Sequence, residues 1–397
     1  MVARNAGKLT FTIRNQVSEL YHLCIATLPV IYVIYIPMLN IGLGTVILLL
    51  FVPYALSFLL RNSSNHVIIT SVFFLLFYIY LIFRSDGNVV RIIMCIASFI
   101  NLYGMIKGSI DSRKLRSAIE LFSLINVWLI IIQIIGYYLF HTRIQFIPQN
   151  IIYEEYRNSY VFTAVDGLYR PSALFFEPSH FSQYCIYALI SVLFPKSEKV
   201  NVKRAVLLGI GCILTTSGMG IALTFAVFVW FLILNREIVG KKIMRLLKIL
   251  PFVAVGLLIL FQMEFFQLAL QRVFQTVDGY NAIAGRTHNW SDAVGNMHGK
   301  LLWFGYGDSQ HYEWYLTGLA DSIYKYGIIC VILEGLCLIH LMIKKIDNYV
   351  WCCCIVFAGL FCVAHLTNFF AQVFYFGIII SDVIYKEPKV KFLIYVI

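Results

Sequence analysis

The chain has 397 residues, of which 60% are hydrophobic and 13% are charged, and its mean hydropathy is +0.81. A water-soluble protein of this length has no interior large enough for so much apolar surface. The composition therefore excludes a soluble globular protein and predicts an integral membrane protein, while the net charge of +11, spread over short loops, favours anionic lipid over nucleic acid as the partner.

Apolar runs follow one another along most of the chain. A helix needs about 20 apolar residues to cross the hydrocarbon core of a membrane. We therefore predict an all-α, polytopic fold with about twelve transmembrane helices in one membrane domain, residues 1–397. The predicted crossings are 24–39, 41–60, 67–83, 89–106, 118–140, 179–194, 205–216, 218–234, 249–264, 320–343, 350–366 and 368–385.

The distribution of positive charge orients these crossings. Cytoplasmic loops carry an excess of Lys and Arg, and a cytoplasmic N-terminus places most of the 31 Lys and Arg residues on the inner side. Basic clusters flank the apolar stretch 205–234 on both sides, so both of its ends are expected inside. A single long tilted helix would place the cluster 236–248 outside. We therefore predict that the stretch turns back at Ser217–Gly220.

Cysteine and acidic residues give no sign of a metal centre. All ten cysteines lie in apolar runs, so no disulfide framework is expected. No set of His, Asp and Glu recurs at helical spacing, and no Gly-rich loop indicates a nucleotide site. We therefore expect neither a metal nor a cofactor.

Two connections are much longer than the others, and both fall on the predicted outer side. They are the loops at about 141–178 and about 265–319. Long ordered loops in a compact protein usually carry function. These two loops also hold most of the polar residues outside the cytoplasmic segments, so we expect any active site there.

The first loop ends in RPSALFFEPSHFSQY, residues 170–184, directly before an apolar run. Pro178 is suited to the first position of a helix, which puts Glu177 at the N-cap, where the helix dipole favours a negative charge. Two interpretations remain open. Glu177 caps the helix and His180 is an interfacial imidazole, or both residues belong with Arg170 to a site at the membrane surface.

The second loop combines charged residues, histidines and aromatic residues. Its Trp and Tyr side chains are typical membrane-interface anchors, and they are also the side chains that stack on sugar rings. Gly305-Tyr306-Gly307 is predicted to form a tight turn. The candidate site residues of this loop and the helix after it are Arg272, Arg286, His288, Tyr306, His311 and Asp321.

Three segments resemble the Wzy-type O-antigen polymerases, within the group of O-antigen ligases and polymerases. RPSALFFEPSHFSQY resembles the Arg–Ser–Glu-Pro-Ser segment of the family, and LTTSGMG resembles its Ser-Gly turn. GRTHNW, FGYGD and DSIYKYGII resemble its second large periplasmic loop and the following helix. These segments span residues 170–184, 214–220, 285–290, 304–308 and 321–329.

The chain also departs from the family pattern. The family is sometimes described with an Arg followed eleven residues later by Gly in both loops. Here Phe181 and Met297 stand where Arg170 and Arg286 would require glycine. Related ligases carry a His-Asn pair before the helix that follows the second loop, where this chain has Asp321-Ser322. The identity of a catalytic base is therefore left open.

The resemblance implies a GT-C-like membrane fold with two large periplasmic loops and about a dozen crossings. It implies an inverting, metal-independent glycosyltransferase of lipopolysaccharide biosynthesis in the bacterial inner membrane, with an active site that faces the periplasm. Such an enzyme moves the growing glycan from undecaprenyl pyrophosphate to a new lipid-linked repeat unit. The family often works with a chain-length regulator, which becomes an expected partner.

The chemistry of that reaction suggests roles for the candidate residues. Negative charge grows on the leaving pyrophosphate, and Arg binds phosphate oxygens bidentately without losing its proton. Arg170 and Arg286 are the leading candidates for this role, followed by Arg272. The acceptor hydroxyl needs a base, for which Glu177 is the first choice. Further candidates for the base are His311, His288 and Asp321, and His180, Tyr306 and His365 are other possible site residues.

Two alternatives to the polymerase remain. An O-antigen ligase would use the same chemistry with a different acceptor, and the missing His-Asn pair argues against it. A flippase or transporter of the lipid-linked oligosaccharide would need cations along a path through the membrane, whereas the cations here lie in the outer loops. Glu334 and Asp382 fall inside apolar runs, where a charge is costly and indicates either function or a packed polar group.

Overall fold

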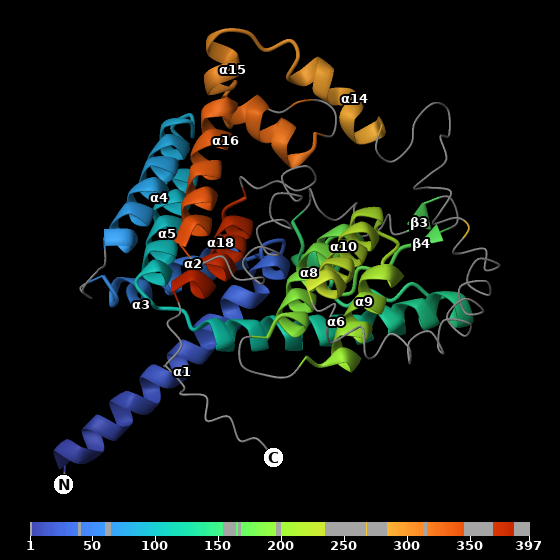
Figure 1. The fold of residues 1–397 in the computed structure, drawn as a ribbon, viewed down its shortest axis with the longest axis horizontal. Helices are drawn as coiled ribbons and strands as arrows, with labels where there is room; N and C mark the ends of the chain where they lie inside the picture. Colours follow the sequence, from blue (N-terminus) through green and yellow to red (C-terminus); the bar gives the residue numbers. More distant parts are fainter. Residues whose placement is uncertain are drawn as a thin grey trace.

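The computed structural model describes most of the chain, and helices predominate in it (Figure 1). Three helices are long and apolar enough to cross a membrane, namely Val89–Ile106, Ser112–Phe140 and Gly318–Leu341. Shorter apolar helices accompany them. The described residues are 2–38, 41–59, 65–153, 164–165, 168–195, 200–234, 267, 284–310, 312, 316–344 and 368–384.

The first predicted crossing, 24–39, is helical only in part. Helix α1 (Val2–Ile31) ends early, and a short hairpin follows in which β1 (Tyr35–Ile36) pairs antiparallel with β2 (Ile41–Gly42). The β-branched residues of this segment favour strands, and Pro37 has no N–H for a helical hydrogen bond. The apolar run is long enough for a helix, but its residue types favour extended backbone at its second half.

Most other described helices coincide with predicted crossings. Helices α5 and α10 match their predicted spans without a shift, and the crossings at 249–264 and 350–366 lie outside the described residues. The elements after β2 are α2 (Leu43–Leu50), α3 (Val52–Leu56), α4 (Asn65–Phe83), α5 (Val89–Ile106), α6 (Ser112–Phe140), the 3-10 helix η1 (Gln149–Ile151), β3 (Ala164–Val165), β4 (Leu168–Tyr169), α8 (Pro178–Leu193), α9 (Val202–Leu214), α10 (Gly218–Leu234), α14 (Ala284–Ala293), α15 (Lys300–Phe304), α16 (Gly318–Lys344) and α18 (Phe369–Ile384).

Helix α6 has an apolar exposed face and a partly polar buried face. Its exposed large residues recur every three or four positions, as one face of a helix requires, and its buried face includes Asn126 and Gln133. A soluble protein places polar groups outside and apolar groups inside. The reverse arrangement fits a lipid-facing surface. The exposed apolar residues of this face are Leu121, Ile125, Trp128, Ile132, Ile135 and Leu139.

Helix α8 is the best-covered helix of the part that the structure describes, and every residue in it except His180 is buried. It packs against α6, α9 and α10. Its Tyr184 hydroxyl donates to the Ala26 carbonyl of α1 at 2.8 Å, and the Tyr184 ring stacks on Phe374 of α18 with centroids 5.1 Å apart. The segment that leads into α8 is therefore anchored to the core of the molecule.

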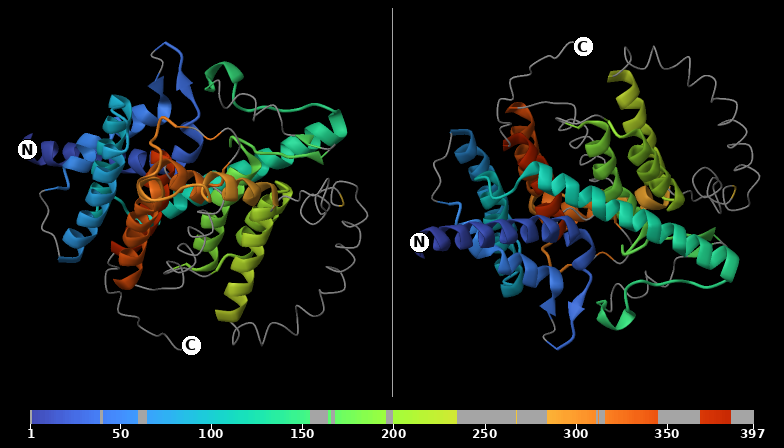
Figure 2. Two further views of the ribbon diagram at one scale, coloured as in Figure 1. Left: turned by 90° about the horizontal axis from the view of Figure 1, so that it is seen from above. Right: turned by 90° about the horizontal axis from the view of Figure 1, so that it is seen from below.

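Helices α4, α5, α16 and α18 form a second group beside α6 and α8–α10 (Figure 1). Helices α1 and α6 pack on each other on the side away from α14 and α15, as the views from above and below also show (Figure 2). Both groups share one hydrophobic core. Helices α14 and α15, from the second long loop, lie over one end of α16.

Candidate functional site

The segment before α8 is held by two buried amide side chains of α6. The Gln133 Oε1 atom accepts from the backbone N–H of Ala173 at 2.9 Å, and the Asn126 Oδ1 atom accepts from that of Leu174 at 3.2 Å. These residues are seven positions apart on one face of α6. Gln133 also donates to the Ile144 carbonyl at 3.0 Å, so it joins both ends of the first loop.

Glu177 occupies the N-cap position of α8, with extended backbone before Pro178 at the first helical position, as predicted. Its side chain makes no capping hydrogen bond. The carboxylate instead accepts from the Ser179 hydroxyl at 2.9 Å and remains half-buried. Glu177 therefore stands at the helix N-terminus, where the dipole stabilises its charge, without serving as a side-chain cap.

Arg170 and His180 flank this carboxylate in the sequence, and both side chains are half-buried. The His180 ring lies with its centroid 5.5 Å from that of Phe176. Arg170 follows β4, between the buried residues Tyr169 and Pro171. The structure therefore keeps the three polar residues of this segment at the boundary of the core rather than on a freely solvated surface.

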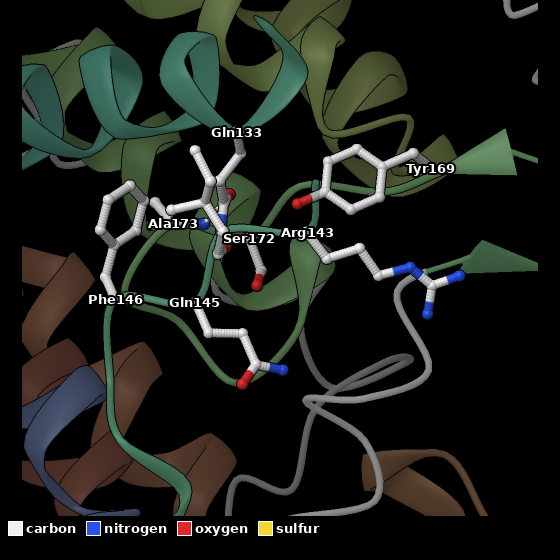
Figure 3. Close-up of a pocket in the computed structure, with 8 residues that line it drawn as sticks. Gln133, Arg143, Gln145, Phe146, Tyr169, Ser172 and Ala173 are labelled. Atoms are coloured by element: carbon white, nitrogen blue, oxygen red, sulfur yellow. Dashed lines mark hydrogen bonds between the residues drawn. The ribbon is translucent and has the colours of Figure 1, made fainter. Parts of the chain in front are cut away.

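A pocket lies at the end of α6, lined in part by residues of the segment that carries Arg170. Figure 3 shows the Tyr169 hydroxyl turned toward Gln133, with the Arg143 side chain extended nearby. Burial raises the pKa of Tyr169 to about 12, against the opposing effect of Arg143, so this hydroxyl keeps its proton at neutral pH. The pocket is lined by Gln133, Arg143, Ile144, Gln145, Phe146, Tyr169, Ser172 and Ala173.

The stretch 205–234 folds back on itself, as predicted, in two helices that pack on each other. The turn begins before the predicted Ser217, because Thr216 takes a left-handed conformation with φ of 54°. Helix α10 starts at Gly218, as its predicted span has it. The Thr215 hydroxyl lies 2.7 Å from that of Ser182 in α8. A Cβ at Gly220 would lie 2.4 Å from the Ser182 Oγ atom, so this turn meets α8 closely.

In the second loop, the FGYGD segment packs on the DSIYKYGII segment. The N–H of Tyr306 donates to the Tyr324 carbonyl at 2.8 Å, and the N–H of Gly307 donates to the Lys325 carbonyl at 2.9 Å. Gly305 and Gly307 have φ of 72° and 110°, and the chain bends between them at Tyr306. The predicted tight turn is a bend whose hydrogen bonds run to α16 and not across a turn. Tyr306 is 40% exposed, and its ring lies against that of Tyr324 at 4.7 Å.

Helix α16 bends at Gly327, where the backbone is not helical and φ is 73°. A Cβ there would lie 2.2 Å from the Trp303 carbonyl oxygen. The close contact between α15 and α16 therefore depends on a residue that has no side chain and that tolerates positive φ.

We expect Gly327→Ala to lower the unfolding free energy by about 2 kcal/mol, from the backbone strain and the clash together. Gly335→Ala is the matched control, because a Cβ at that position of the same helix meets nothing within 4 Å. Thermal unfolding of the purified protein in detergent measures both. Equal melting temperatures of the two variants would show that the close contact contributes nothing.

An ion pair that the sequence did not suggest fastens the FGYGD segment to α5. Arg91 and Asp308 lie 2.6 Å apart, with side chains 17% and 16% exposed. The Tyr326 hydroxyl donates to Asp308 and accepts from Arg91, and the guanidinium lies 5.0 Å from the centroid of the Phe369 ring. The pair is therefore enclosed by α5, α16 and α18.

The turn between α4 and α5 adds further contacts to the same segment. Arg84 donates to the Gly305 carbonyl at 2.9 Å, and Asp86 accepts from the N–H and hydroxyl of Ser309 at 2.9 and 2.8 Å. These Ser309 groups hold the pKa of Asp86 below its usual range, so the contact favours the ionised carboxylate. The only indication in the sequence was that Arg84 lies in the predicted outer loop before the crossing 89–106 and that Arg91 lies near the outer end of that crossing.

Asp321, a candidate base, forms an ion pair with Lys325 in α16. Their charged atoms lie 3.1 Å apart, and the Asp321 side chain is 9% exposed. Nearby, the indole N–H of Trp290 in α14 donates to the Thr317 hydroxyl at 2.6 Å, which joins α14 to the start of α16. The second loop therefore contacts α16 both through α14 and through the FGYGD segment.

Several candidate site residues lie wholly or in part outside the described structure. Arg286 and His288 belong to α14, but their side chains lie outside the described part of the structure, and so do Arg272, His311 and His365 entirely. The convergence of Arg170 and Arg286 on one diphosphate therefore stays a prediction. Among the described residues, no three His, Cys, Asp or Glu side chains gather closely enough to hold a metal ion.

The fold and the site together define a predominantly helical chain with helices able to cross a membrane. Each long loop carries a polar cluster of its own where it meets helix ends, around Glu177 in the first loop and around Asp308 in the second. No family model, no curated protein and no solved structure matches the chain.

Proposed function

We propose that this chain is an O-antigen polymerase, an inverting glycosyltransferase of the bacterial inner membrane that works at the periplasmic face without a metal or cofactor. The hydroxyl of the terminal sugar on a new lipid-linked repeat unit attacks the anomeric carbon of the growing glycan. The bond from that carbon to undecaprenyl pyrophosphate breaks, and the attacking hydroxyl passes its proton to a base. A chain-length regulator is a possible partner.

The observation that carries the proposal is the rigid placement of the segment from Arg170 to Glu177. Asn126 and Gln133 of α6 hold its backbone, and the buried helix α8 holds its end. A base must lie at a fixed position to act on a hydroxyl, and the Glu177 carboxylate is free of a capping role. Arg170 in the same segment supplies the cation that a leaving diphosphate requires.

Disruption of the gene in its host tests the function. Loss of a polymerase leaves lipopolysaccharide that carries a single repeat unit, and a plasmid copy restores the ladder of long chains. Polymer that accumulates on undecaprenol would instead show a ligase. Single units trapped on the cytoplasmic side would show a flippase.

Replacing Glu177 by glutamine keeps the shape of the side chain and removes the base. We expect the polymerisation rate to fall about 10²-fold, because a positioned base contributes at least that much to proton transfer. Quantified ladders from membranes with equal amounts of the variant protein measure the effect. Glu120→Gln, a change to a carboxylate of α6 that accepts from Ser191 at 2.7 Å, is the control and should leave the ladder unchanged. A wild-type rate for Glu177→Gln would exclude this residue as the base.

A further inference from the structure

Glu334 is a carboxylic acid inside a helix of membrane-spanning length, and it has no exposed surface. Its relative exposure is 0%, and neither carboxyl oxygen has a hydrogen-bond partner among the residues that the structure describes. An isolated charge in such surroundings costs several kcal/mol. The carboxyl group must therefore be protonated or neutralised by a bound cation.

Tyr78 of α4 lies next to it, and polar side chains of α5 and α18 lie next to Tyr78. Tyr78 of α4 interacts electrostatically with Glu334, donates to the Gln372 Oε1 atom of α18 at 3.0 Å, and lies beside Ser98 of α5. All four side chains are at most 1% exposed. The helices α4, α5, α16 and α18 pack on one another, so each contributes one polar residue to a cluster in an apolar interior.

This cluster is not satisfied by its own hydrogen bonds. Within the described ranges the Gln372 amide nitrogen has no partner, and the Ser98 hydroxyl has only the Tyr78 hydroxyl beside it. Buried polar groups in proteins are nearly always paired, so several unpaired groups in one cluster point to a ligand. Arg91, a cation that acts electrostatically on the neighbouring Cys330, is already paired with Asp308. The other titratable neighbours are the buried thiols of Cys330 and Cys337, which carry no positive charge.

We propose that Glu334, Tyr78, Ser98 and Gln372 bind a monovalent alkali cation such as Na⁺, which competes with a proton for the Glu334 carboxylate. Carboxylate, hydroxyl and amide oxygens are hard ligands suited to such an ion. One positive charge balances the single carboxylate, whereas a divalent ion would leave a net charge in the interior. The ion joins helices α4, α5, α16 and α18, and the last three of these also enclose the Arg91–Asp308 pair. This site is independent of the proposed glycosyltransferase function.

Dicyclohexylcarbodiimide tests the competition, because it reacts with protonated carboxyl groups in apolar surroundings and leaves a stable N-acylurea. The purified full chain in detergent is labelled in choline chloride or in NaCl, and the modified peptide is found by mass spectrometry. We expect Glu334 to be labelled in choline chloride and the rate to fall about tenfold in NaCl at about ten times the dissociation constant, because only the unoccupied fraction reacts. Labelling that is insensitive to Na⁺, or absent from Glu334 even at acidic pH, would overturn the proposal.

Thermal stability gives a second readout that needs no activity. NaCl is expected to raise the melting temperature of the wild-type protein above its value in choline chloride, since a ligand stabilises the folded state that binds it. Glu334→Gln should abolish this rise, and Gln372→Leu should reduce it if the first variant does not fold. Glu120→Gln should keep it. The same rise in both Glu334→Gln and Gln372→Leu would contradict the site.

Discussion

Arg170→Ala is expected to abolish the long-chain lipopolysaccharide ladder while the protein still inserts in the membrane at its normal level. The side chain is half-buried in the segment that α6 holds, so its guanidinium is restricted in position. Removing one preorganised group that stabilises transition-state charge costs about 10²–10³-fold in rate. Ladder length and polymerisation rate in membranes measure the loss, and an immunoblot confirms the amount of protein.

Matched variants separate the effect of the guanidinium shape on the rate from the effect of its positive charge. Arg170→Lys keeps the positive charge and loses the planar fork, so we expect an intermediate rate. Arg113→Ala removes an exposed cation at the start of α6 and should leave the ladder intact. Arg286→Ala is expected to resemble Arg170→Ala. Normal ladders from both alanine variants would remove these residues from the site and with them the proposed binding of the diphosphate.

A double variant in which Arg170 and Arg286 are both replaced by lysine tests whether the two arginines bind the same diphosphate. Residues that bind the same leaving group act as a unit, and their effects on rate are not additive. The double variant Arg170→Lys with Arg286→Lys should therefore lose less activity than the product of the single losses. A loss equal to that product would indicate two separate sites.

The positions of the helices could be predicted from the sequence because apolar runs report burial in lipid directly. The segments 89–106 and 218–234 became helices with the same bounds, and the basic residues on both sides of 205–234 predicted its return. The hairpin after Ile31 was missed because length and hydropathy do not distinguish a helix from a short extended segment. There, the β-branched residues and Pro37 determined the outcome.

Within the candidate site, the sequence identified local features and missed distant pairs. Glu177 at the N-cap follows from the neighbouring Pro178, and the bend at Tyr306 follows from the glycines on both sides of it. The pair of Arg91 with Asp308 joins residues more than two hundred positions apart, and no local pattern signals such a contact. For the same reason, the buried cluster around Glu334 could be recognised in the sequence only as one costly charge.

Asp308→Ala is expected to lower the unfolding free energy by about 3–4 kcal/mol, because it leaves the Arg91 guanidinium enclosed without its counter-charge. The Tyr326 hydroxyl loses its acceptor in the same variant. Unfolding in detergent measures the change. Asp292→Ala removes an exposed carboxylate of α14 and should stay within about 0.5 kcal/mol of the wild type.

A double-mutant cycle shows whether the pair itself is responsible. Arg91→Leu with Asp308→Leu removes both charges and leaves apolar side chains beside the Phe369 ring, and such a replacement of a buried pair is often close to neutral. The double variant should therefore be more stable than either single leucine variant. If the single effects simply add, the two residues are not coupled. The second loop would then be held to the helices by the close backbone contact at Gly305 and Gly327 and by the hydrogen bonds of Arg84 and Asp86, which the cycle leaves unchanged.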